Sequence, residues 1–166
     1  MRILGIDPGI GTTGWSVVEP SGHQAILEAA GTITTTLGLA TAYRLAELCR
    51  EIRTLIKRFK PREMAVERLF FSRNVTTALK VSEARGIVLL AAAEYNLPIY
   101  EYTPLQVKLA VTGYGKATKQ QVGRMLLHHV QGAAIPNQDD AADAVAVAVT
   151  HVTSRTTISL QNLVGV

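Results

Sequence analysis

The chain has 166 residues, 48% of them hydrophobic and 18% charged, with a formal net charge of +4 at pH 7. This length predicts one domain without room for a second, and the composition excludes disordered and collagen-like chains. The single cysteine, Cys49, excludes an internal disulfide framework and a thiolate-bound metal.

The first part of the chain is expected to form three strands and a helix. Residues 2–7 are mostly apolar and end at an Asp-Pro-Gly turn, which predicts a buried strand whose last residue is Asp7. Residues 15–19 and 24–36 are joined by a short turn and complete a three-stranded antiparallel meander. Between residues 40 and 59, apolar side chains recur at helical spacing with arginine and lysine between them, which predicts an amphipathic helix.

Strands and helices alternate in the rest of the chain. Residues 64–69 are a short apolar run that carries one acid, Glu67, and predicts a buried strand. The later elements are predicted to be a helix, a strand and three further helices, at residues 75–95, 97–102, 104–112, 118–130 and 137–153. We therefore predict an α/β fold with a mixed five-stranded sheet, its first three strands antiparallel, and helices on both sides. The domain is expected to span 1–153, followed by a mobile tail at 154–166.

The sequence does not predict export or membrane insertion. Only four apolar or small residues separate Arg2 from Asp7, too few for a signal peptide. A bilayer-spanning run of about 18 apolar residues is also missing. We therefore expect a soluble, cytoplasmic protein with no membrane partner. Its positive charge favours polyanionic partners without identifying one.

The predicted strands and the last helix place four carboxylates at positions that are unusual for acids. Asp7 ends the first strand, Glu67 lies in a buried strand, and Asp140 and Asp143 share one face of the last helix. Acids in a first helical turn oppose the helix dipole, which accounts for Asp139 and in part for Asp140. The dipole explains Asp143 poorly, because this residue lies at the end of that turn on a helix of alanine and valine. The four side chains are expected to converge at one edge of the sheet.

Such a cluster of carboxylates indicates a site for divalent cations. Like charges repel and raise one another's pKa, so the cluster is stable mainly when cations neutralise it. Oxygen-only ligands favour Mg²⁺ or Mn²⁺, and two such ions about 4 Å apart promote hydrolysis of a phosphodiester. The alternative, that the four acids are unrelated surface residues, stays open on spacing alone.

Three motifs around these acids have a characteristic order. They are Gly5-Ile6-Asp7-Pro8-Gly9 with Gly14 beyond it, Val66-Glu67-Arg68-Leu69-Phe70, and Asp140-Ala141-Ala142-Asp143-Ala144 followed by Thr150-His151. Together they resemble the RuvC family of bacterial crossover junction endodeoxyribonucleases over about residues 1–153. The resemblance implies a ribonuclease-H-like homodimer that cuts two symmetric strands of a Holliday junction in recombination and repair, with a branch-migration helicase complex as a partner.

The resemblance also implies roles for individual residues. The four acids Asp7, Glu67, Asp140 and Asp143 correspond to the family's catalytic acids and would bind Mg²⁺ or Mn²⁺, with two ions per active site. Some members carry histidine in place of the third acid, whereas this chain keeps Asp140.

Candidate DNA-binding residues come from the same resemblance and from the loop that follows Glu67. The stretch containing Lys108 and Lys119 is similar to the family's basic, DNA-facing segment, so both lysines inherit that role. Phe70, the last residue of the second motif, is expected to stack on or wedge between bases of an opened junction, or else to cover the end of the sheet. Arg73 in the same loop is also a candidate for a DNA contact.

Other functional classes fit parts of the sequence. The glycine-rich residues 5–14 also resemble the first phosphate loop of sugar kinases and actin-like ATPases, but those proteins need a second domain for which this chain has no room. A nuclease of the same fold that processes ribosomal RNA precursors is a closer alternative. The Asp-Ala-Ala-Asp spacing favours the junction endonuclease. A binding module without catalysis would not require four intact acids.

The helix predicted at 75–95 is the candidate dimer interface. Its apolar residues cover more of its circumference than one sheet contact requires. Gly86 in its middle costs about 1 kcal/mol of helix propensity relative to alanine. That cost is explained if two backbones approach closely at Gly86, or if the helix lies tightly on its own sheet.

Overall fold

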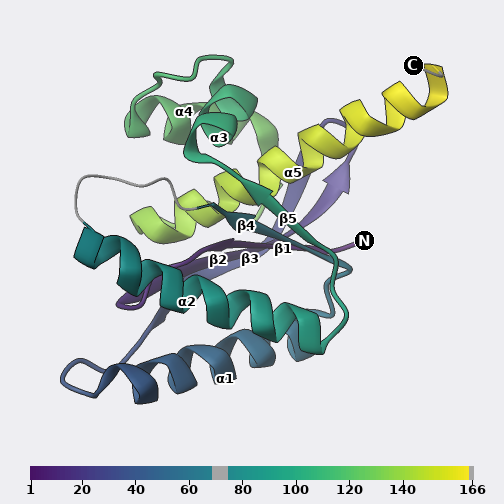
Figure 1. The fold of residues 1–166 in the computed structure, drawn as a ribbon. Coiled ribbons are helices and arrows are strands. Elements are labelled where there is room, and N and C mark those ends of the chain that lie inside the picture. The colour runs from purple at the N-terminus through teal and green to yellow at the C-terminus, as the bar shows by residue number, and fades with distance from the viewer. Residues whose placement is uncertain (69–74, 165–166) are drawn as a thin grey trace.

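Six strands form one mixed sheet in the computed structural model of the protein, which describes residues 1–68 and 75–164 (Figure 1). The strands are β1 (Ile3–Asp7), β2 (Thr12–Ser21), β3 (Gln24–Thr34), β4 (Glu63–Glu67), β5 (Ile99–Tyr102) and β6 (Val130–Gly132). Their order in the sheet is β5-β4-β1-β2-β3-β6. The first three strands pair antiparallel as predicted, and β4, β5 and β6 run parallel to the strands they join.

The sheet has one strand more than the sequence predicted. The additional strand, β6, pairs with residues 25–27 of β3 at the edge of the sheet. It has only three residues, follows directly after a helix and ends at Gly132, whose φ is 93°. A run this short shows no alternating pattern, so only the tertiary pairing reveals it.

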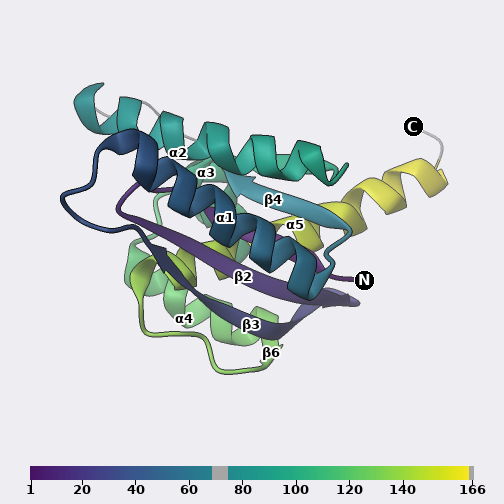
Figure 2. The same cartoon turned by 90° about the horizontal axis from the view of Figure 1, so that it is seen from below.

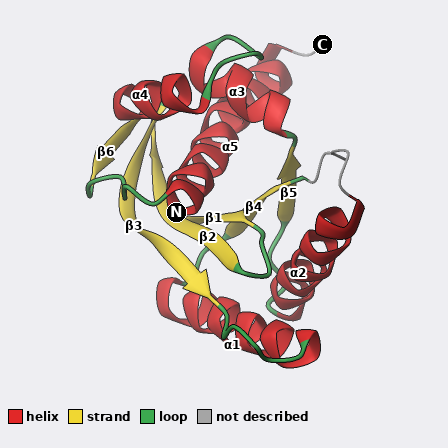
Figure 3. Ribbon diagram, turned by 90° about the vertical axis from the view of Figure 1, so that its left-hand side faces the viewer, coloured by secondary structure: helices red, strands yellow, loops and turns green. Residues whose placement is uncertain are grey.

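Helices cover both faces of the sheet. On one face, α1 (Thr41–Phe59) and α2 (Val75–Glu94) lie side by side (Figure 2). On the other face, α5 (Asp139–Val164) crosses the sheet, with α3 (Pro104–Thr112) and α4 (Lys119–His129) packed beside it (Figure 3). α5 runs to Val164, whereas the sequence predicted an end near residue 153. Within the described residues, no helix is both long and apolar enough to cross a bilayer.

Alternation along β1 divides the core into two layers. Leu4 and Ile6 pack in the layer under α1 and α2, whereas Ile3 belongs to the layer under α5. Because side chains alternate between the faces of a strand, Gly5 and Asp7 share the α5 face with Ile3. The strand therefore delivers an acid to the face that α5 covers.

Two glycines let α5 lie directly on the strand backbones. A Cβ atom on Gly5 would stand 2.5 Å from the carbonyl oxygen of Ala144, and one on Gly14 would stand 1.8 Å from that of Asp140. The Ser16 hydroxyl, on β2, donates a hydrogen bond of 2.9 Å to the Ala144 carbonyl. The first turns of α5 are thus held against β1 and β2 without an intervening layer of side chains.

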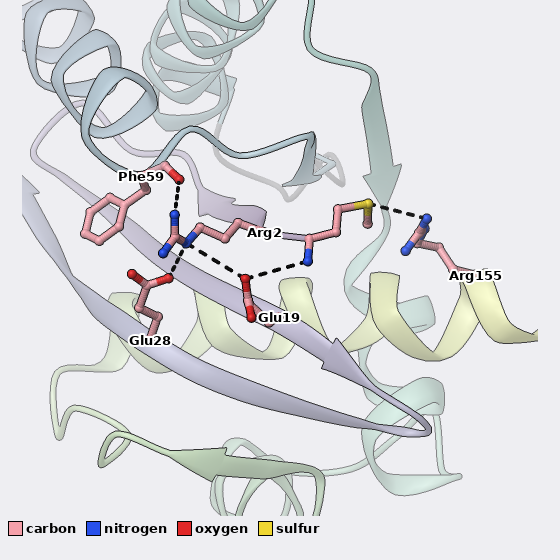
Figure 4. A network of polar contacts seen from close by, with 6 residues as sticks. Arg2, Glu19, Glu28, Phe59 and Arg155 are labelled. Atoms are coloured by element: carbon pink, nitrogen blue, oxygen red, sulfur yellow. Dashed lines mark hydrogen bonds and ion pairs between the residues drawn. The ribbon is translucent and has the colours of Figure 1, made fainter.

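A polar network ties the strands to the end of α1 (Figure 4). The Arg2 guanidinium donates to the carboxylate of Glu28 at 2.5 Å and to the carbonyl of Phe59 at 3.2 Å. The N-terminal amine lies 3.6 Å from the carboxylate of Glu19. These groups are partly exposed, so each pair contributes at most about 1 kcal/mol to stability.

Candidate active site

Two of the predicted acids end neighbouring parallel strands. The register of β1 and β4 pairs Ile6 with Val66, and the next residue on each strand is Asp7 or Glu67. Glu67 is two residues beyond Ala65, which packs in the layer under α5. Alternation therefore places both carboxylates on the α5 face, at the same end of the sheet.

α5 brings the other two acids to this place. Gly14 of β2 is the register partner of Asp7, and the backbone of Asp140 lies against it. Asp143 follows three residues later, on the same side of the helix. The negative charges of Glu67, Asp143 and Asp140 all act to raise the pKa of Asp7. The structure therefore brings the four predicted acids together.

Burial and mutual repulsion change how the strand-end acids ionise. Burial, the largest cause, and the neighbouring carboxylates together raise the pKa of Asp7 to about 8. Burial also raises the pKa of Glu67, although the hydrogen bond from Asp7 and the positive charges of Lys119 and Lys108 oppose the rise. A hydrogen bond between two carboxyl groups requires a proton on one of them. At pH 7, the pair therefore retains a proton when no cation is bound.

Two lysines stand beside the acids, each in a helix with a capped start. Lys119 opens α4, where Thr118 and Gln121 form a capping box, and Lys108 lies in α3, which has the same kind of cap. The Lys119 ammonium lies 2.9 Å from the carboxylate of Asp143 and 3.2 Å from that of Asp139. Partial burial alone would lower the pKa of Lys119, but these two contacts raise it above its usual value.

A pocket of about 240 Å³ opens beside this cluster, and it is lined by Glu67, Pro104, Val107, Lys108, Lys119, Val122, Asp143 and Ala146. Its walls combine two carboxylates and two ammonium groups with an apolar floor. A phosphate group near the acids would therefore meet positive charge from both α3 and α4.

The chemistry of the donor set fits magnesium or manganese. All four acids offer carboxylate oxygens, and their mutual repulsion calls for a neutralising cation. Across residues 1–68 and 75–164, no three His, Cys, Asp or Glu side chains are arranged to hold a metal ion as they stand. The Asp7–Glu67 hydrogen bond and the Lys119–Asp143 ion pair engage carboxylate oxygens that an ion would also approach.

The remaining predicted DNA-binding residues lie outside the described part of the chain. Phe70 and Arg73 both fall between residues 68 and 75. Their roles therefore stay predictions.

A buried polar network further along α5 was missed by sequence reasoning. His151 is 1% exposed, and its ring nitrogens lie 2.6 Å from the Tyr102 hydroxyl and 2.7 Å from the carboxylate of Glu63. Arg155 also contacts Glu63, at 3.0 Å. Burial lowers the pKa of His151. The network fastens α5 to β4 and β5, but its partners are too far apart in sequence for any local pattern to reveal it.

Comparisons with known proteins point to one group of enzymes. A family model described as Crossover junction endodeoxyribonuclease RuvC matches residues 3–151. The chain is 46% identical to the protein of that name from Brevibacillus brevis over 160 residues, which are 96% of each chain. It is 47% identical to the one from Chloroflexus aggregans over 158 residues, 95% of this chain and 96% of that protein. Among solved structures, Thermus thermophilus RuvC in complex with a Holliday junction substrate matches with a TM-score of 0.88 and 35% identity, covering 95% of this chain and 96% of that chain.

Proposed function

The chain belongs to the RuvC crossover junction endodeoxyribonuclease family, and we propose that it resolves Holliday junctions by hydrolysing phosphodiesters in two symmetric strands, in recombination and repair. Its helix-flanked mixed sheet is the ribonuclease-H-like fold of that family. The observation that carries the proposal is the convergence of four carboxylates from β1, β4 and α5 beside two lysines.

We propose that Asp7, Glu67, Asp140 and Asp143 are the catalytic acids and hold two Mg²⁺ or Mn²⁺ ions. When bound, the ions would activate a water molecule and stabilise the leaving oxygen of the phosphodiester. The protein positions the four carboxylates through two strand ends and one helix start. Lys108, together with Phe70 and Arg73, is proposed to contact the DNA. Lys119 is proposed to do so as well.

The experiment that tests this function compares two DNA substrates. We expect the purified protein to cut a synthetic four-way junction in two opposed strands when Mg²⁺ is present, and to leave it intact in EDTA. A linear duplex of the same sequence should be cut far more slowly. Equal cutting of the duplex would identify a nuclease that does not recognise junctions.

Replacing Lys108 with alanine should weaken the dependence of junction binding on salt. A lysine that neutralises one phosphate contributes about one unit to the slope of log affinity against log salt concentration, because binding releases a counterion. We therefore expect the slope to fall by about one unit in Lys108→Ala, measured by fluorescence anisotropy. Lys57 is an exposed lysine of α1, on the opposite face of the sheet, so Lys57→Ala should keep the wild-type slope. An unchanged slope in Lys108→Ala would remove this residue from the DNA-binding surface.

We further propose that the protein is a homodimer joined through α2. The helix buries Ala84, Val88, Ala91 and Ala92 against its own core. Its outer side carries an exposed seam with alternating steps of four and three residues, formed by Leu79, Glu83, Gly86, Leu90 and Ala93. This spacing is typical of helices that pair along their length. A Cβ atom at Gly86 would meet nothing within 4 Å, so the glycine is not needed for packing on its own sheet.

Replacing Gly86 with leucine should therefore give a folded monomer. The bulky side chain would block the close approach of two helices, while leucine itself favours a helix more than glycine does. Sedimentation should show the monomer, with weak junction binding and no paired cuts, because symmetric cutting needs two active sites related by a two-fold axis. Gly123→Leu is the matched control, since Gly123 is also an exposed helical glycine with open space around it, on α4. If Gly86→Leu sediments as a tight dimer, the interface lies elsewhere.

The remaining proposals concern the cellular setting. A junction in a bacterial chromosome lies in the cytoplasm, so we propose that the protein acts there. We also propose that it works with a branch-migration helicase complex, a partner for which the family resemblance is the support.

A further inference from the structure

Lys119 has two carboxylate partners with different surroundings. Asp143 is one of the four clustered acids, and its side chain is 33% exposed. Asp139 lies at the start of α5, outside that set, and its side chain is 77% exposed. The Lys119 side chain itself is 54% exposed, so its ammonium has room to move away from Asp143. Lys119 therefore contacts one acid of the cluster and one acid that is exposed to solvent.

We propose that Lys119 is a built-in counter-ion of the metal site, which a divalent cation displaces from Asp143 and thereby frees to contact a DNA phosphate. This inference rests on the proposed function. It makes cation binding and DNA binding two linked events, joined through one side chain.

The proposal follows from the charge at Asp143. The ammonium lies 2.9 Å from Asp143 Oδ2, and a divalent ion bound to the same carboxylate would lie within a few ångströms of it, where the two cations repel each other. The ion must therefore compete with Lys119 for the carboxylate. Asp139 offers the displaced ammonium a partner only 3.2 Å from its present position, which lowers the cost of release.

The capped start of α4 keeps the displaced ammonium near the site. Thr118 and Gln121 fix the backbone at Lys119, so only the flexible lysine side chain needs to move. The same side chain lines the pocket beside Glu67 and Asp143. A lysine freed there meets the phosphate that enters the pocket, whereas a lysine held on Asp143 has part of its charge already neutralised.

The first test measures Mn²⁺ binding by calorimetry without DNA, in wild type, Lys119→Met and Lys108→Met. Methionine keeps most of the side-chain length and removes the charge. We expect Lys119→Met to bind Mn²⁺ on the order of tenfold more tightly than wild type, because no ammonium competes for Asp143. Lys108→Met removes a positive charge beside Glu67, so it reports the general effect of charge loss and should change the affinity by only about twofold.

The second test measures junction binding against salt, in EDTA and in Ca²⁺, under conditions in which no cleavage product forms. Wild type and Lys108→Met should each gain about one unit of salt slope in Ca²⁺, since the cation frees one lysine for a phosphate. Lys119→Met should show the same slope in both buffers.

The outcomes separate this inference from the proposed function. If wild type binds Mn²⁺ but Lys119→Met binds it no more tightly than Lys108→Met, Lys119 does not compete with the ion and the inference is wrong, while the proposed function stands. If wild type binds no Mn²⁺, the metal-dependent function fails and the inference fails with it.

Discussion

Replacing Asp7 with asparagine is expected to abolish junction cleavage while junction binding survives. Asparagine keeps the shape of the side chain but removes a negative oxygen from the end of β1, where four carboxylates converge. Since each bound ion contributes several kcal/mol to stabilising the transition state, the loss should exceed about 10³-fold in single-turnover rate. In EDTA, where no cation displaces Lys119, DNA affinity depends on the positive surface, so the dissociation constant should change little.

The same substitution should stabilise the protein in the absence of divalent cations. The pKa of Asp7 is about 8 in the folded protein and 3.8 in its ordinary state, so between these values the folded state binds a proton that the unfolded state has released. Stability therefore falls as pH rises from about 4 to 8. Asparagine does not titrate, so it removes this pH-dependent cost near neutral pH.

Urea unfolding in EDTA at pH 5 and pH 8 measures this effect. Wild type should lose more stability between the two pH values than Asp7→Asn does. Glu51→Gln on α1 is the control, because it also removes one carboxylate but lies outside the site; it should keep both the wild-type pH dependence and cleavage. If Asp7→Asn lost junction binding in proportion to cleavage, the proposed division between metal-holding acids and a DNA-binding surface would be wrong.

The acids were predictable because each breaks a local pattern. Asp7 stops an apolar strand, Glu67 lies in another, and Asp143 lies on a helix of alanine and valine, so each position calls for an explanation beyond packing. Apolar runs, helical spacing, turn residues and cap residues also located the helices and the first five strands. The convergence of the four acids depends on the strand order and register of the sheet, and neither can be read from the sequence of a single element.

The contacts between distant elements could not be read from the sequence. The pairing of Lys119 with Asp143 joins α4 to α5, and the contact of His151 with Glu63 spans 88 residues. Neither pair has a spacing that a helix or a strand would enforce. The edge strand β6 was also not predicted, because its three residues form a strand only by pairing with the distant strand β3.

Gly14 contributes to the site without a functional side chain, because its lack of a Cβ atom leaves room for α5. The family resemblance includes it, but only the structure gives its physical role, because the residue it accommodates lies on α5. A methyl group at this position would need to occupy the space of the Asp140 carbonyl oxygen, at 1.8 Å, and the carbonyl carbon at 2.4 Å. Both are backbone atoms, so no side-chain rotation relieves the overlap.

Gly14→Ala should therefore separate the start of α5 from β2 and disable the site. A displacement of about 1 Å in catalytic groups costs on the order of 10²-fold in rate, and overpacking a tight contact costs about 1–3 kcal/mol of stability. We expect both losses, measured by single-turnover junction cleavage and by urea unfolding. Mn²⁺ affinity should fall as well, because Asp140 and Asp143 move with the helix.

Gly123→Ala provides the matched control for this substitution. An added methyl group at Gly123 meets nothing within 4 Å, so alanine there should raise stability by up to about 1 kcal/mol through helix propensity and leave cleavage unchanged. Both variants replace glycine with alanine, so a difference between them reports the steric effect of the added methyl group at Gly14. If Gly14→Ala cut junctions at the wild-type rate, the sheet and α5 would tolerate more separation than the site geometry implies, and the position of the acids would not depend on this contact.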